Sequence, residues 1–262
     1  MNDLQQILGR RLRQLPHAEV VESATVRGPL IPAARESAML KGVFFDLDET
    51  LIDADGCHRE ASRRAFAAFG MDWDEAFRRT GPFFGRRMRE ILETRRNALG
   101  VSEVAAPVED LVGLREEHYV NLFPAGVCLL SGAREAVASV RDHGAVAAIV
   151  SSSARATVEL TLEHYDLSRL VSFVVGGNDV KRGKPDPECY ERAHHRLQSF
   201  RSAAKHECLV VEDSSVGVTS ARLAGLPVCL VPRYPLAEPV KPEYTLASLD
   251  EFPGLVARLS GR

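Results

Sequence analysis

The feature that most constrains the fold is the segment Val43-Phe44-Phe45, an apolar run that leads directly into Asp46 and Asp48. A short apolar run without polar alternation is typical of a strand that is buried on both faces of a parallel sheet. In open α/β sheets, ligands bind in the crevice at the carboxyl ends of the strands. The two aspartates therefore lie where such a sheet builds its site. Two close carboxylates there favour a divalent cation that takes oxygen ligands, such as Mg²⁺.

Three later segments add candidate site residues. Residues 145–150 and 209–211 are further apolar runs, and each is predicted to be a buried strand with polar residues directly after it. Between them, Asp186 as N-cap and Pro187 as first helical residue predict that a helix begins shortly after Lys184. The candidate residues in these segments are Ser151, Ser152, Lys184, Glu212 and Asp213.

In chain order, these segments resemble the four motifs of the haloacid dehalogenase superfamily, from about residue 41 to about residue 231. Asp46 to Thr50 matches the first motif, Asp-x-Asp-x-Thr, at every position. Each segment alone has a simpler explanation, because a serine cluster often caps a helix and a lone lysine is usually a surface residue. A carboxylate pair likewise suits a helix N-terminus. The joint order of the four segments favours the superfamily.

The resemblance implies Mg²⁺-dependent hydrolysis of a small phosphorylated metabolite, such as a sugar phosphate. Asp46 is the expected nucleophile, which forms an aspartyl-phosphate, and Asp48 is the expected general acid and base. Ser151, Ser152 and Lys184 are expected to hold phosphate oxygens, since phosphoryl transfer depends mainly on positioning and charge stabilisation. The implied metal ligands are Asp46, Asp213, Glu212 and the backbone carbonyl of Asp48, while Thr50 is expected to orient the loop.

The interval between the first two motifs is too long for a strand-to-helix connection, so it predicts an inserted unit. Helical periodicity at residues 60–69, 86–99 and 109–122 resembles the type 1 helical cap of the superfamily. The expected fold is α/β, a Rossmann-like parallel sheet flanked by helices with this cap inserted. Strands are expected near residues 43–46, 146–150, 172–175, 208–212 and 228–231. The expected organisation is an N-terminal extension over residues 1–40, a core over residues 41–53 and 126–262, and a cap over residues 54–125.

Arginines are concentrated in the cap, where residues 78–96 hold many more arginines than acidic residues. This excess favours an anionic group on the substrate. The alternative is a solvated helix face with i,i+4 pairs, such as Arg86 with Glu90 and Arg89 with Glu93. We expect most of these arginines to be solvated and one or two to reach the cleft. The candidates for substrate contact are His58, Phe84, Arg86 and Arg87, although a lone histidine is more often structural and a phenylalanine more often part of the core.

Other reactions of the superfamily are distinguished by the first motif. The dehalogenase and phosphonate-cleaving branches lack the second aspartate, which is Asp48 here. Mutases similar to beta-phosphoglucomutase share all four motifs but commonly carry Gly-Val where this chain has Glu49-Thr50. A phosphosugar mutase is therefore an alternative to the phosphatase, and a non-catalytic regulatory relative is a second one.

Composition agrees with a globular enzyme. The chain has 262 residues, 45% of them hydrophobic and 26% charged, and a net charge of −3, which provides no basic surface for nucleic acid. No apolar run is long enough to span a membrane. Five cysteines without a C-x-x-C pair favour a reducing, cytoplasmic location. Residues 4–15 have the periodicity of an amphipathic helix, and the composition leaves the oligomeric state open.

Overall fold

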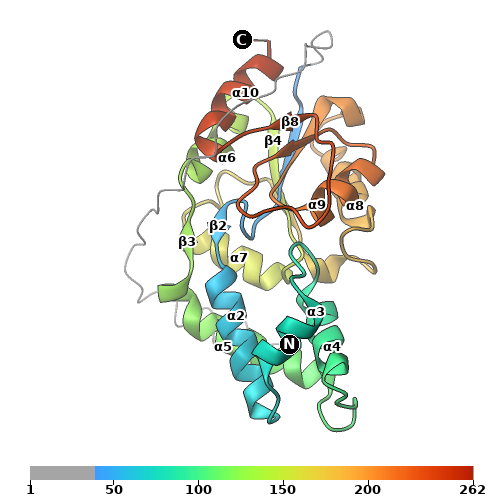
Figure 1. Cartoon of the computed structure of the whole chain (residues 1–262). Helices are drawn as coiled ribbons and strands as arrows, with labels where there is room; N and C mark the ends of the chain where they lie inside the picture. The colour runs from blue at the N-terminus through green and yellow to red at the C-terminus, as the bar shows by residue number, and fades with distance from the viewer. Residues whose placement is uncertain (1–38, 262) are drawn as a thin grey trace.

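The computed structural model describes residues 39–261, and its core is a parallel sheet of six strands within that range (Figure 1). The order across the sheet is β5-β4-β1-β6-β7-β8. The strands are β1 (Gly42–Phe45), β4 (Val146–Val150), β5 (Phe173–Val175), β6 (Cys208–Glu212), β7 (Val228–Leu230) and β8 (Tyr244–Thr245). The predicted α/β fold class is confirmed, whereas β8 was not predicted and the N-terminal helix expected at residues 4–15 lies outside the described residues.

The pairing of β1 determines where a site forms. Strand β1 pairs with β4 on one side and with β6 on the other, and Phe45 lies level with Ile149 and Val211. The residues that directly follow these positions therefore meet at one edge of the sheet. From β1, the strands β4 and β5 follow on one side of the sheet, and β6, β7 and β8 follow on the other. The strand order thus reverses at β1, so this edge is a topological switch point, where a crevice opens at the strand ends.

Alternate residues of β1 face opposite layers, as expected for a pleated strand. Val43 and Phe45 pack in a cluster with α6 (Ala133–Asp142), α7 (Arg155–His164) and α10 (Phe252–Leu259). Phe44 packs on the other face, against α8 (Glu188–Leu197) and α9 (Ser215–Leu223). The sheet is thus covered on both faces, which explains why its strands read as apolar runs. Short 3₁₀ helices span Gly177–Asp179, Lys205–Glu207 and Leu249–Glu251.

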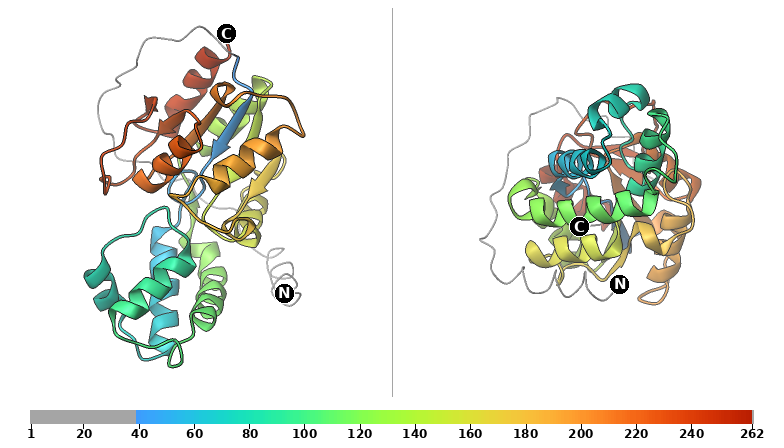
Figure 2. Two further views of the ribbon diagram at one scale, coloured as in Figure 1. Left: turned by 90° about the vertical axis from the view of Figure 1, so that its right-hand side faces the viewer. Right: turned by 90° about the horizontal axis from the view of Figure 1, so that it is seen from below.

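Four helices come between β1 and β4 along the chain. They form a layer beyond the carboxyl ends of the sheet strands (Figure 2). They are α2 (Asp55–Ala68), α3 (Trp73–Thr80), α4 (Met88–Ala98) and α5 (Val108–Gly126). These helices, here called the cap, bury their own apolar cluster around Phe66, Trp73 and Leu92. The antiparallel strands β2 (Ile52–Asp53) and β3 (Cys128–Leu129) carry the chain between cap and core.

The helix boundaries differ from the predicted ones for physical reasons. Helix α2 begins at Asp55 rather than near residue 60, because Glu49 accepts hydrogen bonds from backbone N–H groups at its start. Helix α3 was not predicted, although Asp72 provides an N-cap by accepting from two backbone N–H groups. Helix α8 begins at Glu188, one residue later than predicted, with Pro187 as its N-cap. Such one-residue differences are common at helix ends.

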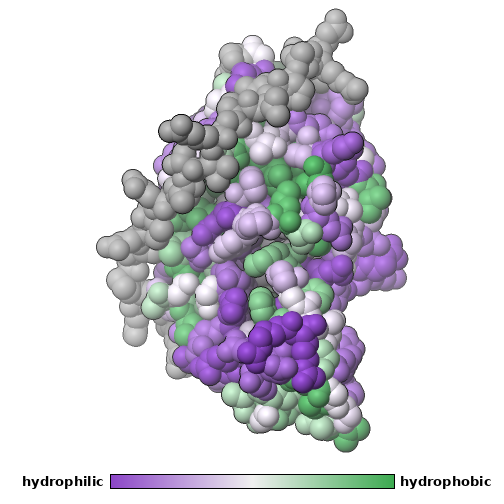
Figure 3. Space-filling view, viewed as in Figure 1, coloured by the Kyte–Doolittle hydropathy of each residue, from purple (hydrophilic) through white to green (hydrophobic). Residues whose placement is uncertain are grey.

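The surface of the described residues is mixed in character. Hydrophilic residues gather over the cap on the face that Figure 3 presents. No helix of residues 39–261 combines the length and the apolar character that a membrane crossing requires. All five cysteines are free thiols.

Candidate active site

Three carboxylates gather at the carboxyl ends of β1 and β6. Asp46 follows β1, Glu212 ends β6 and Asp213 comes next, and an oxygen of each lies within 4.8 Å of the others. All three side chains are buried. Burial, together with the neighbouring carboxylates, raises the pKa of Asp46 to about 8 and that of Asp213 well above its usual value. Three ionised carboxylates at this buried site are therefore unfavourable unless a positive charge lies beside them.

Lys184 provides a compensating positive charge inside this cluster. Its Nζ donates to Asp46 Oδ1 at 2.6 Å, to Glu212 Oε1 at 2.6 Å and to the carbonyl oxygen of Val150 at 3.1 Å. These bonds use all three N–H groups of the ammonium. Burial lowers the pKa of Lys184, but the two carboxylates outweigh it and hold the pKa well above its usual value. One ammonium does not offset three ionised carboxylates, so the pKa values of Asp46 and Asp213 stay raised and a further positive charge is needed to ionise both.

Glu212 is engaged by several donors besides Lys184. Its Oε1 accepts from the hydroxyl of Tyr190 at 2.5 Å, and its Oε2 accepts from Ser214 at 3.2 Å. Gly217 lies so close that a Cβ there would be 1.9 Å from the Glu212 carboxylate. The carboxylate is therefore clamped in place, and it holds Lys184 in turn.

The cluster fits a hard divalent cation. Among residues 39–261, the carboxylate of Asp213 and the Oδ2 atom of Asp46 accept no hydrogen bond, so these oxygens are available as ligands. Carboxylate oxygens are ligands that Mg²⁺ prefers, and the charge of a bound cation would favour their ionised form. Asp46 and Asp213 thus fit a metal better than Glu212, whose oxygens already accept hydrogen bonds.

Asp48 lies on the same loop as Asp46 but contacts different groups. Its Oδ1 lies 3.0 Å from His58 Nε2, and its Oδ2 accepts from Ser153 at 2.7 Å and from Ser151 at 3.3 Å. Burial raises the pKa of Asp48, but the His58 ring, the hydrogen bonds of His58 and Ser153, and nearby Arg115 lower it to about 2. His58 belongs to α2, so a cap helix holds the carboxylate that is expected to move protons.

The serine triplet is divided between the core and the cap. Ser152, an expected phosphate ligand, lines the pocket between cap and core and donates to the carbonyl oxygen of Gly85 in the cap at 2.7 Å. Ser153, which was not expected to act, donates to Asp48. The sequence indicated that the serine triplet lies at the site. The path of the chain after β4 determines which serine hydroxyl contacts the cap and which contacts Asp48. Thr50 is buried, and its hydroxyl has no hydrogen-bond partner within the described residues.

Glu49 joins the loop after β1 to the cap and had no signal in the sequence. It adopts a left-handed backbone with φ 65°, and its Oε1 accepts from the N–H groups of Ala54 and Asp55 at 2.8 Å each. Arg233, from the segment after β7, lies 3.3 Å from Glu49 and 2.9 Å from Asp53. Burial, opposed by these partners, raises the pKa of Glu49 to about 7.

Of the expected cap arginines, Arg86 and Arg87 have different surroundings. The predicted pair of Arg86 with Glu90 is wrong, because Glu90 pairs with Arg87 instead. Helix α4 begins only at Met88, so Arg86 lies in the preceding turn rather than one helical turn before Glu90. The predicted pair of Arg89 with Glu93 is present at 3.6 Å.

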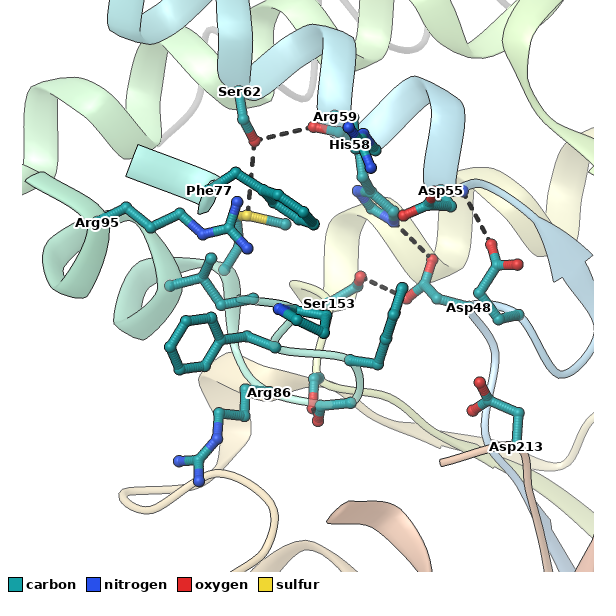
Figure 4. A pocket seen from close by; sticks show the side chains of 18 of the residues that line it. Asp48, Asp55, His58, Arg59, Ser62, Phe77, Arg86, Arg95, Ser153 and Asp213 are labelled. Atoms are coloured by element: carbon teal, nitrogen blue, oxygen red, sulfur yellow. Dashed lines mark hydrogen bonds and ion pairs between the residues drawn. The ribbon is translucent and has the colours of Figure 1, made fainter. Parts of the chain in front are cut away.

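A pocket lies between the cap and the core (Figure 4), and Asp46, Asp48 and Asp213 are among the residues that line it. Three of the four candidates for substrate contact, His58, Phe84 and Arg86, line it, whereas Arg87 does not. Its cap side consists largely of apolar and aromatic residues from α3, α4 and the turn between them. These include Trp73, Phe77, Pro82, Phe83, Met88 and Ile91.

Comparisons with known proteins agree with this geometry. The family model for the haloacid dehalogenase-like hydrolases matches residues 43–231. The chain is 32% identical over 200 residues to Protein CbbY of Rhodobacter capsulatus, covering 74% of this chain and 86% of the relative. It is 32% identical over 227 residues to the plasmid phosphoglycolate phosphatase of Cupriavidus necator, covering 83% of this chain and 94% of the relative.

The fold also has solved counterparts. The structure of CbbY from Rhodobacter sphaeroides in complex with phosphate superposes with a TM-score of 0.68 at 23% identity, covering 81% of this chain and 96% of the other. The family match spans the segment from the strand before Asp46 to the strand after Asp213. The family predicted from the four motifs is therefore confirmed: the chain is an enzyme that belongs to the haloacid dehalogenase-like hydrolases.

Proposed function

We propose that the protein is a Mg²⁺-dependent phosphatase that hydrolyses a small phosphate monoester through an aspartyl-phosphate at Asp46. The observation that carries this proposal is the separation of two aspartates on one loop. Asp46 contacts Lys184 at 2.6 Å, whereas Asp48 contacts His58 at 3.0 Å. Two carboxylates in such different surroundings suit two different roles, one as nucleophile and one in proton transfer.

In the first step, a carboxylate oxygen of Asp46 forms a bond to phosphorus and the bond to the ester oxygen breaks. The leaving oxygen takes a proton from Asp48, whose neighbour His58 is within hydrogen-bond distance. In the second step, water attacks the phosphorus of the aspartyl-phosphate and gives a proton to Asp48, which restores the Asp46 carboxylate. The pKa of Asp48, lowered to about 2, corresponds to the ionised form that accepts this proton. The first step requires the protonated form, which the negative charge of a bound phosphate would favour.

Lys184 and Ser151 would hold phosphoryl oxygens while this exchange takes place, each giving up a present hydrogen bond, that of Lys184 to the Val150 carbonyl oxygen and that of Ser151 to Asp48. Lys184 already bridges Asp46 and Glu212, so its charge lies beside the oxygen that attacks. Asp46, Asp213 and the backbone carbonyl of Asp48 would hold Mg²⁺, with Glu212 nearby. The bound ion supplies positive charge that offsets the repulsion between a carboxylate and a phosphate dianion.

The names of relatives support phosphate ester hydrolysis. A relative of the chain in Cupriavidus necator is named as a phosphoglycolate phosphatase, and one in Thermotoga maritima, 29% identical over 187 residues, as a phosphorylated carbohydrates phosphatase. We therefore place the substrate among small phosphorylated metabolites.

The test measures phosphate release from phosphosugars, phosphoglycolate, nucleotides and 4-nitrophenyl phosphate, with Mg²⁺ and after its removal by a chelator. Asp46→Asn is compared with Asp142→Asn, a change at an exposed residue of α6. We expect metal-dependent release in the wild type and in Asp142→Asn, and none in Asp46→Asn. Undiminished release by Asp46→Asn would exclude the proposed nucleophile. Interconversion of sugar phosphates without net release would indicate a mutase, and inactivity toward every compound would favour a regulatory role.

A further inference from the structure

Most arginines of the cap have carboxylate partners. The cap arginines that form ion pairs with glutamates are at positions 63, 64, 78, 79, 87, 89, 96 and 115. Among the described residues, Arg59, Arg86 and Arg95 are the cap arginines that form no ion pair. All three line the pocket between cap and core. The unpaired positive charges of the cap are thus gathered where a substrate would bind.

Arg95 is the best defined of the three. It projects from α4 with an exposed fraction of only 3%, and its guanidinium lies 4.2 Å from the ring centroid of Trp73 and 4.4 Å from that of Phe77. Its Nη2 donates to the carbonyl oxygen of Gly81 at 3.0 Å. Figure 4 shows the guanidinium directed from α4 toward Phe77, on the cap side of the pocket.

Several buried donors near this guanidinium have no acceptor. The Nε and Nη1 atoms of Arg95 and the Nε1 atom of Trp73 form no hydrogen bond within residues 39–261. Buried polar atoms are normally paired, because leaving a buried donor without an acceptor is unfavourable. Because all of these atoms are donors, only an acceptor can satisfy them.

The charge at this end of the pocket makes the acceptor an anion. Burial, reinforced by the charge of Arg59, lowers the pKa of Arg95 to about 10, which still leaves the guanidinium protonated at neutral pH. The guanidinium of Arg59 lies 4.6 Å from the centroid of the Phe77 ring, which Arg95 also contacts, so two cations share one aromatic ring. Asp55 also lines the pocket, and its charge acts on Arg95 and partly opposes the lowering of the pKa, but it forms no ion pair with either arginine.

We propose that Arg95, with Arg59, binds a second anionic oxygen group of the substrate, a carboxylate or a second phosphate, at the cap end of the pocket. This inference rests on the proposed function, because the same molecule presents its phosphate ester to Asp46. The preferred substrates are then phosphate monoesters that carry an anion at the opposite end. A guanidinium suits this role because its fork of N–H donors matches the oxygens of a carboxylate or phosphate.

The test compares kcat/KM within matched pairs of compounds. Glucose 6-phosphate is paired with 6-phosphogluconate, which adds a carboxylate, and fructose 6-phosphate with fructose 1,6-bisphosphate, which adds a phosphate. We expect the wild type to prefer the anionic member of at least one pair by about tenfold or more, as charge-assisted hydrogen bonds to a partly desolvated arginine allow. The pair that shows the preference distinguishes a carboxylate from a phosphate.

The variants are Arg95→Met, which retains an apolar side chain against Trp73, and Arg95→Lys, which retains the charge. The control is Arg89→Met, an exposed residue on the same helix that does not line the pocket. We expect Arg95→Met to reduce the preference at least about tenfold, Arg95→Lys to retain part of it and Arg89→Met to retain all of it. Circular dichroism spectra of all variants show whether the cap remains folded.

The outcomes separate the two proposals. Hydrolysis of phosphate esters with equal kcat/KM for both members of each pair would overturn the anion subsite and leave the phosphatase intact. The same conclusion follows if Arg95→Met slows both members of a pair equally. If no compound is hydrolysed, the proposed function fails. Calorimetric binding of the same pairs to the wild type then tests the anion subsite by itself. Equal affinities for the two members of each pair would reject it. If Arg95→Met does not fold, Arg59→Met replaces it, with the same loss of preference expected.

Discussion

At the scale of single residues, His58 shows how a contact changes the role of an ordinary side chain. Its Nε2 lies 3.0 Å from Asp48, its Nδ1 is hydrogen-bonded to Arg115, and its ring stacks on Tyr119 at 4.6 Å between centroids. Since Arg115 is a donor without acceptor capacity, it can bond only the unprotonated Nδ1, so the proton of a neutral ring lies on Nε2, toward Asp48. His58 is thus a positioning residue for Asp48.

We predict that His58→Ala lowers kcat for phosphate release by about 10²-fold, the lower end of what proton transfer by a positioned group contributes. KM is expected to change much less, because Asp46 and Lys184 remain in place. His206→Ala, at an exposed histidine of the core, is the control and should behave as the wild type. Steady-state kinetics on one good substrate provide both parameters. A kcat within twofold of the wild type would show that Asp48 is held adequately by Ser151 and Ser153.

At the scale of elements, the loop after β1 and the start of α2 are joined by the Glu49 side chain. Its Oε1 accepts from two N–H groups that a helix cannot satisfy internally. Arg233 holds the same carboxylate from the segment after β7. The loop after β1, the first cap helix and the core are therefore connected through one side chain.

Replacing Glu49 with Ala should reduce the free energy of unfolding by about 1–2 kcal/mol, since helix N-cap acceptors contribute this much. The control is Glu117→Ala, at an exposed residue of α5, with little expected change. Urea unfolding followed by circular dichroism measures both. Equal stability of Glu49→Ala and the wild type would mean that water replaces the carboxylate at the helix start.

A second connection between elements gives a dependence on pH. Asp179 accepts from Arg155 of α7 at 2.5 Å and from the N–H of Gly176 at 2.8 Å. Burial raises the pKa of Asp179, but these two donors outweigh it and lower the pKa below its usual value. Because the folded-state pKa lies below the unfolded value, the ionised Asp179 carboxylate stabilises the protein above about pH 4. This stabilisation is lost as the pH falls through the folded-state pKa.

Asp179→Asn should therefore have a lower Tm than the wild type at pH 7, and the difference should shrink as the pH is lowered toward 3. Asp142→Asn, at an exposed residue, should show no difference at either pH. Thermal unfolding at several pH values tests this. A difference between Asp179→Asn and the wild type that persists unchanged at low pH would indicate that the ionised carboxylate is not its cause.

At the scale of the whole molecule, the cap and the core meet around the pocket through a few contacts. Phe84 of the cap stacks on Tyr234 of the core with centroids 5.3 Å apart and planes 12° apart. Ser152 of the core donates to Gly85 of the cap at 2.7 Å. Closure of such a layer over a site excludes water and completes the set of contacts to the substrate.

Tyr234→Ala should lower kcat/KM by about three- to tenfold, the range that one aromatic pair contributes. The Tm should change little, because both rings are partly exposed. The control is Phe200→Ala, which removes a similar stacked pair with Phe173, at 5.4 Å, away from the pocket. A fall in kcat/KM that is equal in the two variants would assign the effect to stability rather than to closure.

The fold was largely predictable because its signals are local. The strands β1, β4, β5, β6 and β7 lie within one or two residues of the predicted ranges, since strands buried on both faces require continuous apolar runs. The short strands β2, β3 and β8 and the helix α3 were missed, because two to eight residues carry too little periodicity. The family followed from the order of the four motifs, and the comparisons confirm it.

The sequence by itself determined the fold class, the family and the loops that end at the site, because apolar runs and the polar residues after them are encoded side by side. Only the tertiary structure decided that Ser153 rather than Ser152 faces Asp48, and that Arg95 of all cap arginines is buried without a carboxylate. The physical reason is that these outcomes depend on distances between residues far apart in the chain. Packing of the cap against its own aromatic rings and against the core sets those distances.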